Sequence, residues 1–144
     1  MKVKVMKLKP DAILPTRGSV SAAGYDLYAC LDTESIVIES GKTVKVGTGL
    51  AFEIPEGYFG AIFARSGLAA KGLRPANCVG VADSDYRGEY IVALHNDSSS
   101  DMTVCRGDRI AQLVVMPYLS VEFEESQSLE QTERGAGGFG STGK

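Results

Sequence analysis

Short apolar runs separated by turn residues recur along most of the chain. Gly, Pro, Asn and Asp gather between these runs, for example at residues 55–57, 97–101 and 106–108. Alternating or β-branched runs predict strands at 3–8, 36–38, 44–54, 58–63, 90–94, 110–116 and 121–123. Many short strands joined by frequent turns are typical of a sandwich or barrel, so the pattern predicts an all-β domain.

Only residues 66–71 suggest a helix, of two turns at most, and Gly72 follows it. The composition changes near residue 125. Residues 124–133 are polar and acidic, and residues 134–144 read RGAGGFGSTGK. Such a segment cannot bury enough apolar surface to fold alone. We therefore predict one β domain over residues 1–125 and a flexible C-terminal tail over residues 126–144.

Composition and charge exclude several classes of partner. The chain has 144 residues, of which 44% are hydrophobic and 23% charged, which indicates one ordinary globular domain. Its net charge of −3 gives no cationic excess for a phosphate backbone, so we expect no nucleic-acid partner. No apolar run approaches the ~20 residues of a membrane span, and none follows the lysine-rich N-terminus as in a signal peptide. We expect no membrane partner and a cytoplasmic location.

The cysteines and the single histidine offer little chemistry. Cys30, Cys78 and Cys105 lie far apart and are odd in number, which argues against a disulfide framework or a zinc site. We expect reduced, buried thiols. No G-x-S-x-G motif accompanies His95, so a surface or strand-end histidine is favoured over a catalytic one.

The tail carries groups that could bind an anion. Residues 138–144 match G-x-x-x-x-G-K, but no strand precedes them and no helix can follow, so they do not form a P-loop. Glycine-rich backbone can still turn its N–H groups toward an anion, and Ser141, Thr142 and Arg134 add donors. Phe139 could stack on a planar ring. Composition alone favours the alternative, a disordered linker.

Acidic and basic residues mark four further segments. In residues 80–88, Asp83 and Asp85 would share one side of an extended strand and suit general-base or metal-water chemistry; a solvated hairpin turn is the ordinary alternative. Residues 65–67, Arg-Ser-Gly, could bind phosphate at a helix start, or Ser66 could simply be the N-cap. Residues 107–113 read as a turn entering a strand, with a surface Asp–Arg pair, and residues 23–29 as a loop with an acid.

Taken in order, these segments resemble the motifs of the trimeric dUTPase family across nearly the whole chain. The five are AGYDLYA at 23–29, ARSGLA at 64–69, NCVGVADSDYRGEY at 77–90, GDRIAQL at 107–113 and RGAGGFGSTG at 134–143. The resemblance implies a β jelly roll and a homotrimer with active sites at subunit interfaces, each closed by the tail of a neighbour. It implies Mg²⁺-dependent hydrolysis of dUTP to dUMP and pyrophosphate, which limits uracil incorporation into DNA and supplies dUMP for dTMP synthesis.

The same resemblance assigns roles to individual residues. Asp83 matches the general base that directs water at the α-phosphorus, and Tyr86 matches the ring under the deoxyribose. Asn77 matches the uracil contact, and Asp26 an acid near metal-bound waters. The remaining substrate-binding positions are the phosphate contacts Arg65, Ser66, Gly67 and Gln112 and the closing tail residues Arg134, Phe139, Gly140, Ser141 and Thr142. Magnesium would sit mainly on the triphosphate oxygens.

Two positions depart from the family pattern, and three alternatives stay open. Ala64 replaces the usual proline, which could soften the phosphate turn, and Ala82 replaces isoleucine or leucine just before Asp83. A dCTP deaminase on the same fold is the nearest rival, although the complete DYRG and FGSTG segments argue against it. A protein of this fold that mainly binds a regulatory partner is a second rival, and a generic β interaction module a third.

Overall fold

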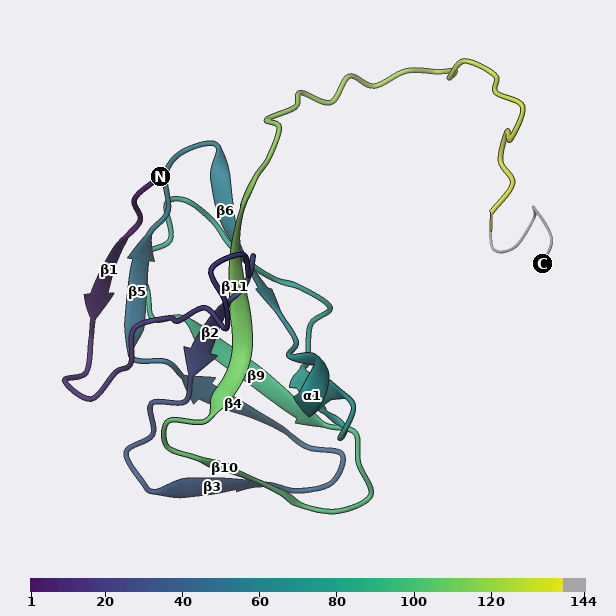
Figure 1. Ribbon diagram of the computed structural model, residues 1–144. Coiled ribbons are helices and arrows are strands. Elements are labelled where there is room, and N and C mark those ends of the chain that lie inside the picture. The colour runs from purple at the N-terminus through teal and green to yellow at the C-terminus, as the bar shows by residue number, and fades with distance from the viewer. Residues whose placement is uncertain (139–144) are drawn as a thin grey trace.

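The computed structural model describes residues 1–138 and consists of eleven strands and one short helix (Figure 1). The strands are β1 (Lys4–Lys7), β2 (Tyr25–Tyr28), β3 (Ser35–Ile38), β4 (Thr43–Gly47), β5 (Leu50–Glu53), β6 (Tyr58–Phe63), β7 (Leu73–Pro75), β8 (Gly80–Ala82), β9 (Ile91–Asn96), β10 (Met102–Cys105) and β11 (Arg109–Pro117). The helix α1 spans Ser66–Ala69. None of the helical structure in residues 1–138 is long and apolar enough to cross a membrane.

The strands pair antiparallel into four small sheets around one core. Their orders are β2-β11-β6-β8, β4-β9-β7, β1-β5 and β10-β3. Alternate residues of the strands point inward, so Leu27, Ile38, Leu50, Leu94 and Ile110 are almost completely buried. The predicted all-β, jelly-roll-like architecture is confirmed.

Two of the sequence-based assignments are wrong. Residues 121–123 form no strand, and the Phe123 side chain is 94% exposed, because no other strand within residues 1–138 pairs with this run. Residues 25–28 were expected as a loop but form β2, which pairs with β11 and buries Leu27. The strands β7 and β10 were not predicted.

The free cysteines differ in their surroundings. Cys30 is buried, but Cys78 and Cys105 are exposed, so the expectation of buried thiols holds for one of the three. His95 lies in β9, where Thr43 Oγ1 is 2.8 Å from its Nδ1 and Asp97 is 3.0 Å from its Nε2. This position near a strand end agrees with the structural interpretation of His95.

Beyond β11 the chain leaves the sheets and runs away from the core (Figure 1). Tyr118 N still donates to Gly57 O at 3.1 Å, but Leu119 and Leu129 are both 88% exposed. The described part of this arm, residues 118–138, contains no strand. The boundary near residue 125 stays a prediction.

Candidate active site

The central strand β11 brings three of the motifs together. Gln112 pairs with Asp26 of β2 on one side and with Phe63 of β6 on the other. The chain leaves β6 directly into the turn at Ala64 and Arg65 that starts α1. Segments about 40 residues apart in the sequence thus meet at one point of the four-stranded sheet.

Asp26 lies at the centre of a charged cluster there. Its Oδ1 accepts a hydrogen bond from Arg65 Nε at 2.8 Å, and its Oδ2 one from Arg109 Nη1 at 3.3 Å. The Asp26 side chain is only 14% exposed, whereas that of Arg109 is 51% exposed. Two guanidinium groups facing one carboxylate leave one positive charge in excess, which suits a phosphate group.

Sequence reasoning missed the part played by Arg109. It expected a surface pair between Asp108 and Arg109, but Asp108 Oδ2 instead accepts a hydrogen bond from Cys105 N at 2.8 Å and closes the turn. Gly107, with φ of 80°, allows that turn. Arg109 pairs with an acid 83 residues earlier, a contact for which the local sequence carries no signal.

Gln112 holds the start of the phosphate turn. Its Nε2 donates to Ala64 O at 2.8 Å, so the turn is tethered although Ala64 replaces the more rigid proline. Gly24 makes room for this side chain, because a Cβ there would lie 3.2 Å from Gln112 Cδ. Arg65, and not Ser66, occupies the N-cap position of α1 and makes no side-chain cap hydrogen bond. The alternative of a Ser N-cap is therefore wrong, and Ser66 and Gly67 are exposed.

A second group of motif residues lies around β8, at the edge of the same sheet. Asn77 is exposed, and its Nδ2 lies against Gly80, where a Cβ would be 3.4 Å away. After β8 the chain turns, with Tyr86 N donating to Asp83 O at 3.1 Å. Asp83 and Asp85 therefore stand on a turn and not on an extended strand.

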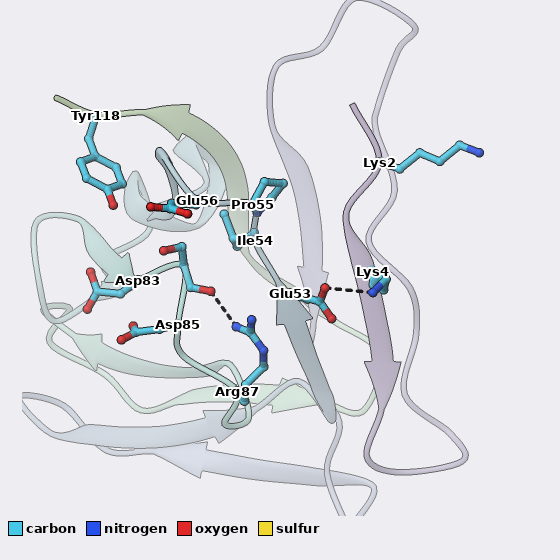
Figure 2. A pocket seen from close by; sticks show the side chains of 11 residues that line it. Lys2, Lys4, Glu53, Ile54, Pro55, Glu56, Asp83, Asp85, Arg87 and Tyr118 are labelled. Carbon is cyan, nitrogen blue, oxygen red and sulfur yellow. Dashed lines mark hydrogen bonds and ion pairs between the residues drawn. The ribbon is translucent and has the colours of Figure 1, made fainter. Parts of the chain in front are cut away.

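Asp83 and Asp85 help to line an open hollow of about 780 Å³, and their carboxylates point away from Glu53 and Lys4 on its other side (Figure 2). Tyr118 lines the hollow on the same side as Asp83. Arg87 supports the turn from beneath, because its Nη1 donates to Ser84 O at 2.6 Å and to Tyr86 O at 3.1 Å. Asp83 is thus exposed on a turn whose backbone is held by several hydrogen bonds.

The ring of Tyr86 folds back over this turn. Its hydroxyl donates to Glu89 O at 3.0 Å, and the side chain is 45% exposed. A Cβ at position 88 would lie 2.6 Å from Tyr86 Cζ, so only glycine leaves room for the ring. The ring is thereby held on the turn that also carries Asp83 and stays partly exposed, although Tyr86 does not line the hollow itself.

Within one chain, the cluster around Asp26 and the residues around β8 do not line a common hollow. The hollow beside Asp83 is not lined by Asp26, Arg65 or Gln112. Arg134 is exposed on the arm, and Phe139, Gly140, Ser141 and Thr142 lie outside the described residues. Among residues 1–138, no three His, Cys, Asp or Glu side chains are grouped to hold a metal ion.

Comparisons with known proteins agree with this arrangement. A model of the dUTPase family matches residues 10–143. Deoxyuridine 5'-triphosphate nucleotidohydrolases of Desulfitobacterium hafniense and Nautilia profundicola are 52% and 47% identical; the matches cover 99% and 100% of this chain and 97% and 100% of the relatives. A variant of the Staphylococcus bacteriophage 80alpha dUTPase with dUpNHpp matches with a TM-score of 0.89, 28% identity and 99% of both chains covered. The chain therefore belongs to the dUTPase family.

Proposed function

We propose that this chain hydrolyses dUTP to dUMP and pyrophosphate, which limits uracil incorporation into DNA and supplies dUMP for dTMP synthesis. One observation carries the proposal: the exposed Asp83 and the partly exposed Tyr86 stand on one hydrogen-bonded turn, while the guanidinium groups around Asp26 supply a phosphate site. The free thiol of the buried Cys30 suits a reducing, cytoplasmic compartment.

In this mechanism Asp83 is the general base. It accepts a proton from a water molecule whose oxygen attacks the α-phosphorus, and pyrophosphate leaves with the electrons of the broken P–O bond. The exposure of Asp83 on a hydrogen-bonded turn supports the role, since the carboxylate can reach water without moving the backbone. Positioning and charge neutralisation supply most of the rate enhancement.

The other motif residues bind the nucleotide. Asn77 contacts the uracil, and Tyr86 packs under the deoxyribose. Arg65, Ser66, Gly67 and Gln112 contact the phosphates, and the tail closes over them through Arg134, Phe139, Gly140, Ser141 and Thr142. Asp26 holds Arg65 in place, and this contact supports the assignment because an ordered guanidinium loses little entropy on binding phosphate.

The residues fit a magnesium ion held mainly by the substrate. Both Asp26 oxygens already accept a hydrogen bond from an arginine, which disfavours direct ligation but leaves lone pairs for a metal-bound water. Magnesium keeps several waters and is commonly bound through substrate phosphates, where it neutralises charge. A variant of the phage phi11 dUTPase of S. aureus, 25% identical with a TM-score of 0.81, is described with a structural Mg(II) ion.

A homotrimer would unite the two groups of site residues. An apolar hollow of about 470 Å³ opens on the surface, lined in part by Val3, Val5, Tyr25 and Val115, and apolar surface of this kind favours a subunit contact. We expect analytical ultracentrifugation without ligand to give three times the 15.3 kDa chain mass. An active monomer at the assay concentration would contradict the proposal.

We expect Tyr86 to select the deoxy sugar. A ring packed against the sugar leaves no room for a 2′-hydroxyl, so Tyr86→Ala should lower the ratio of dUTP to UTP turnover at least about tenfold, the scale of one lost steric contact. Steady-state kcat/KM for both nucleotides measures the ratio. An unchanged ratio would show that the sugar is recognised elsewhere.

A substrate panel tests the proposed function itself. Pyrophosphate release should be fast from dUTP and slow from dTTP, dCTP and UTP. Ammonia release from dCTP would instead identify the deaminase alternative. Absence of pyrophosphate release from dUTP by the magnesium-loaded trimer would overturn the proposal and favour a binding role.

A further inference from the structure

Tyr90 links the core to the sugar-binding ring, although no role in the site has been assigned to it. Its side chain is 1% exposed. The ring contacts Phe52, with centroids 4.4 Å apart, and Tyr86, with centroids 6.0 Å apart and ring planes at 36°. The exposed Tyr86 is therefore supported from behind by a buried ring that is itself packed in the core.

The hydroxyl of Tyr90 also lies near β8, the strand that directly precedes Asp83. A Cβ built on Gly60 would lie 3.0 Å from Tyr90 Oη and 3.5 Å from Ala82 Cβ, and Gly60 and Ala82 are paired between β6 and β8. The phenol oxygen of Tyr90, Leu113 Cδ1 and Ala82 Cβ therefore border the space above Gly60. Asp83 follows Ala82 directly, so this packing lies one residue away from the base.

The buried position of the Tyr90 hydroxyl lowers the stability of the fold. This argues that the Tyr90 ring has a role other than stabilising the core. Tyr90 Oη is buried and has no hydrogen-bond partner among the described residues, a situation that destabilises a fold. Burial raises the pKa of Tyr90 to about 12, so the phenol stays neutral at physiological pH. Leucine would fill the core without an unpaired hydroxyl, but it would place no ring against Tyr86.

We propose that Tyr90 is a positioning residue for the nucleotide site: it fixes the Tyr86 ring under the sugar and takes the space that the short Ala82 side chain leaves behind Asp83. The proposal rests on the proposed dUTP hydrolysis. A larger side chain at position 82, such as isoleucine or leucine, would compete with the Tyr90 phenol for the same space. Tyr90 and Ala82 thus form a matched pair.

The first test separates positioning from stability. Tyr90→Leu should raise KM for dUTP and lower the dUTP to UTP ratio of kcat/KM about tenfold, with a smaller change in kcat, because Tyr86 loses its support. Tyr90→Phe, which keeps the ring, should restore the ratio. Leu94→Ala, a fully buried truncation on the following strand β9, should lower Tm without changing the ratio.

A double-mutant cycle with Tyr86 shows whether Tyr90 acts through that ring. In a Tyr86→Ala background, Tyr90→Leu should leave the ratio unchanged, since the group that it positions is already absent. Additive losses would contradict the inference. An unchanged dUTP to UTP ratio in Tyr90→Leu, measured against an active wild type, would also contradict the inference. An inactive wild type would contradict the proposed function instead.

The shared space behind Asp83 is tested without substrate. Ala82→Ile should lower Tm, because the added atoms meet the Tyr90 phenol, and Tyr90→Leu in the same chain should restore most of that loss. This double variant also supplies a folded protein for the kinetic test should Tyr90→Leu alone unfold. Equal Tm losses from Ala82→Ile in the Tyr90 and Leu backgrounds would overturn the matched pair.

Discussion

Replacing Asp83 with asparagine should abolish turnover while dUTP still binds. The amide keeps the shape of the carboxylate and can stand on the same turn, but it cannot take a proton from water. General-base catalysis contributes roughly 10²–10⁴-fold, so kcat should fall by at least that range while the Kd for dUTP changes little. Single-turnover pyrophosphate release measures the first quantity, and calorimetry with a non-hydrolysable dUTP analogue the second.

Asp85 provides a matched control for this experiment. It stands on the same turn, is exposed and lines the same hollow, so Asp85→Asn makes the same change of charge two residues away. Turnover in Asp85→Asn should stay near the wild-type value. Near-normal turnover in Asp83→Asn, or an equal loss in both variants, would remove Asp83 from the role of base.

Removing residues 134–144 should cost orders of magnitude in turnover but leave the fold and the trimer intact. The described residues of the arm are almost all exposed, so their loss removes little buried apolar surface. Closure over the nucleotide would exclude water and complete the charges around the phosphates. Turnover at saturating dUTP, thermal unfolding and sedimentation of the truncated chain measure the three expectations.

A chain that ends at Gly138 separates the contribution of Arg134 to kcat from that of the residues after Gly138. It keeps Arg134 but lacks Phe139 and the Gly-Ser-Thr run, so its kcat should lie between those of the full chain and the shorter truncation. A bound dUTP analogue should also slow tryptic cleavage after Arg134 in the full chain. Wild-type turnover in both truncations, or no protection by the analogue, would show that the tail is only a linker.

The strands that could be predicted from the sequence are those whose own residues form an apolar or alternating run. Residues 58–63 are aromatic and apolar throughout, and β6 has those bounds. The four residues of β2 include an acid and two tyrosines, and it is pairing with β11 that makes them a strand. Residues 121–123 show the reverse case, because an alternating run needs a neighbouring strand to cover it and the described chain provides none.

The contacts of the candidate site also fall into two kinds: those within one sequence motif and those that depend on how the strands pair. Asp83 and Tyr86 could be expected on one turn because they lie within one continuous motif around β8, and their roles, like that of Asn77, stay predictions. The pairing of Asp26 with Arg65 and Arg109 could not be expected, because it joins β2, β11 and the N-cap residue of α1 through contacts 39 and 83 residues apart in the sequence. Likewise, the contact between Tyr90 and the Gly60–Ala82 pair depends on strand register, which no local pattern fixes.

Two glycines near the site illustrate how mutational data from this enzyme should be interpreted. Gly24 and Gly88 leave room for Gln112 and Tyr86, respectively, and need not touch the nucleotide at all. A saturation-mutagenesis map would nonetheless score them as intolerant, like direct binding positions. A ligand-binding surface inferred from such a map would be too large, because it would include backbone positions that only make space for the side chains proposed to bind.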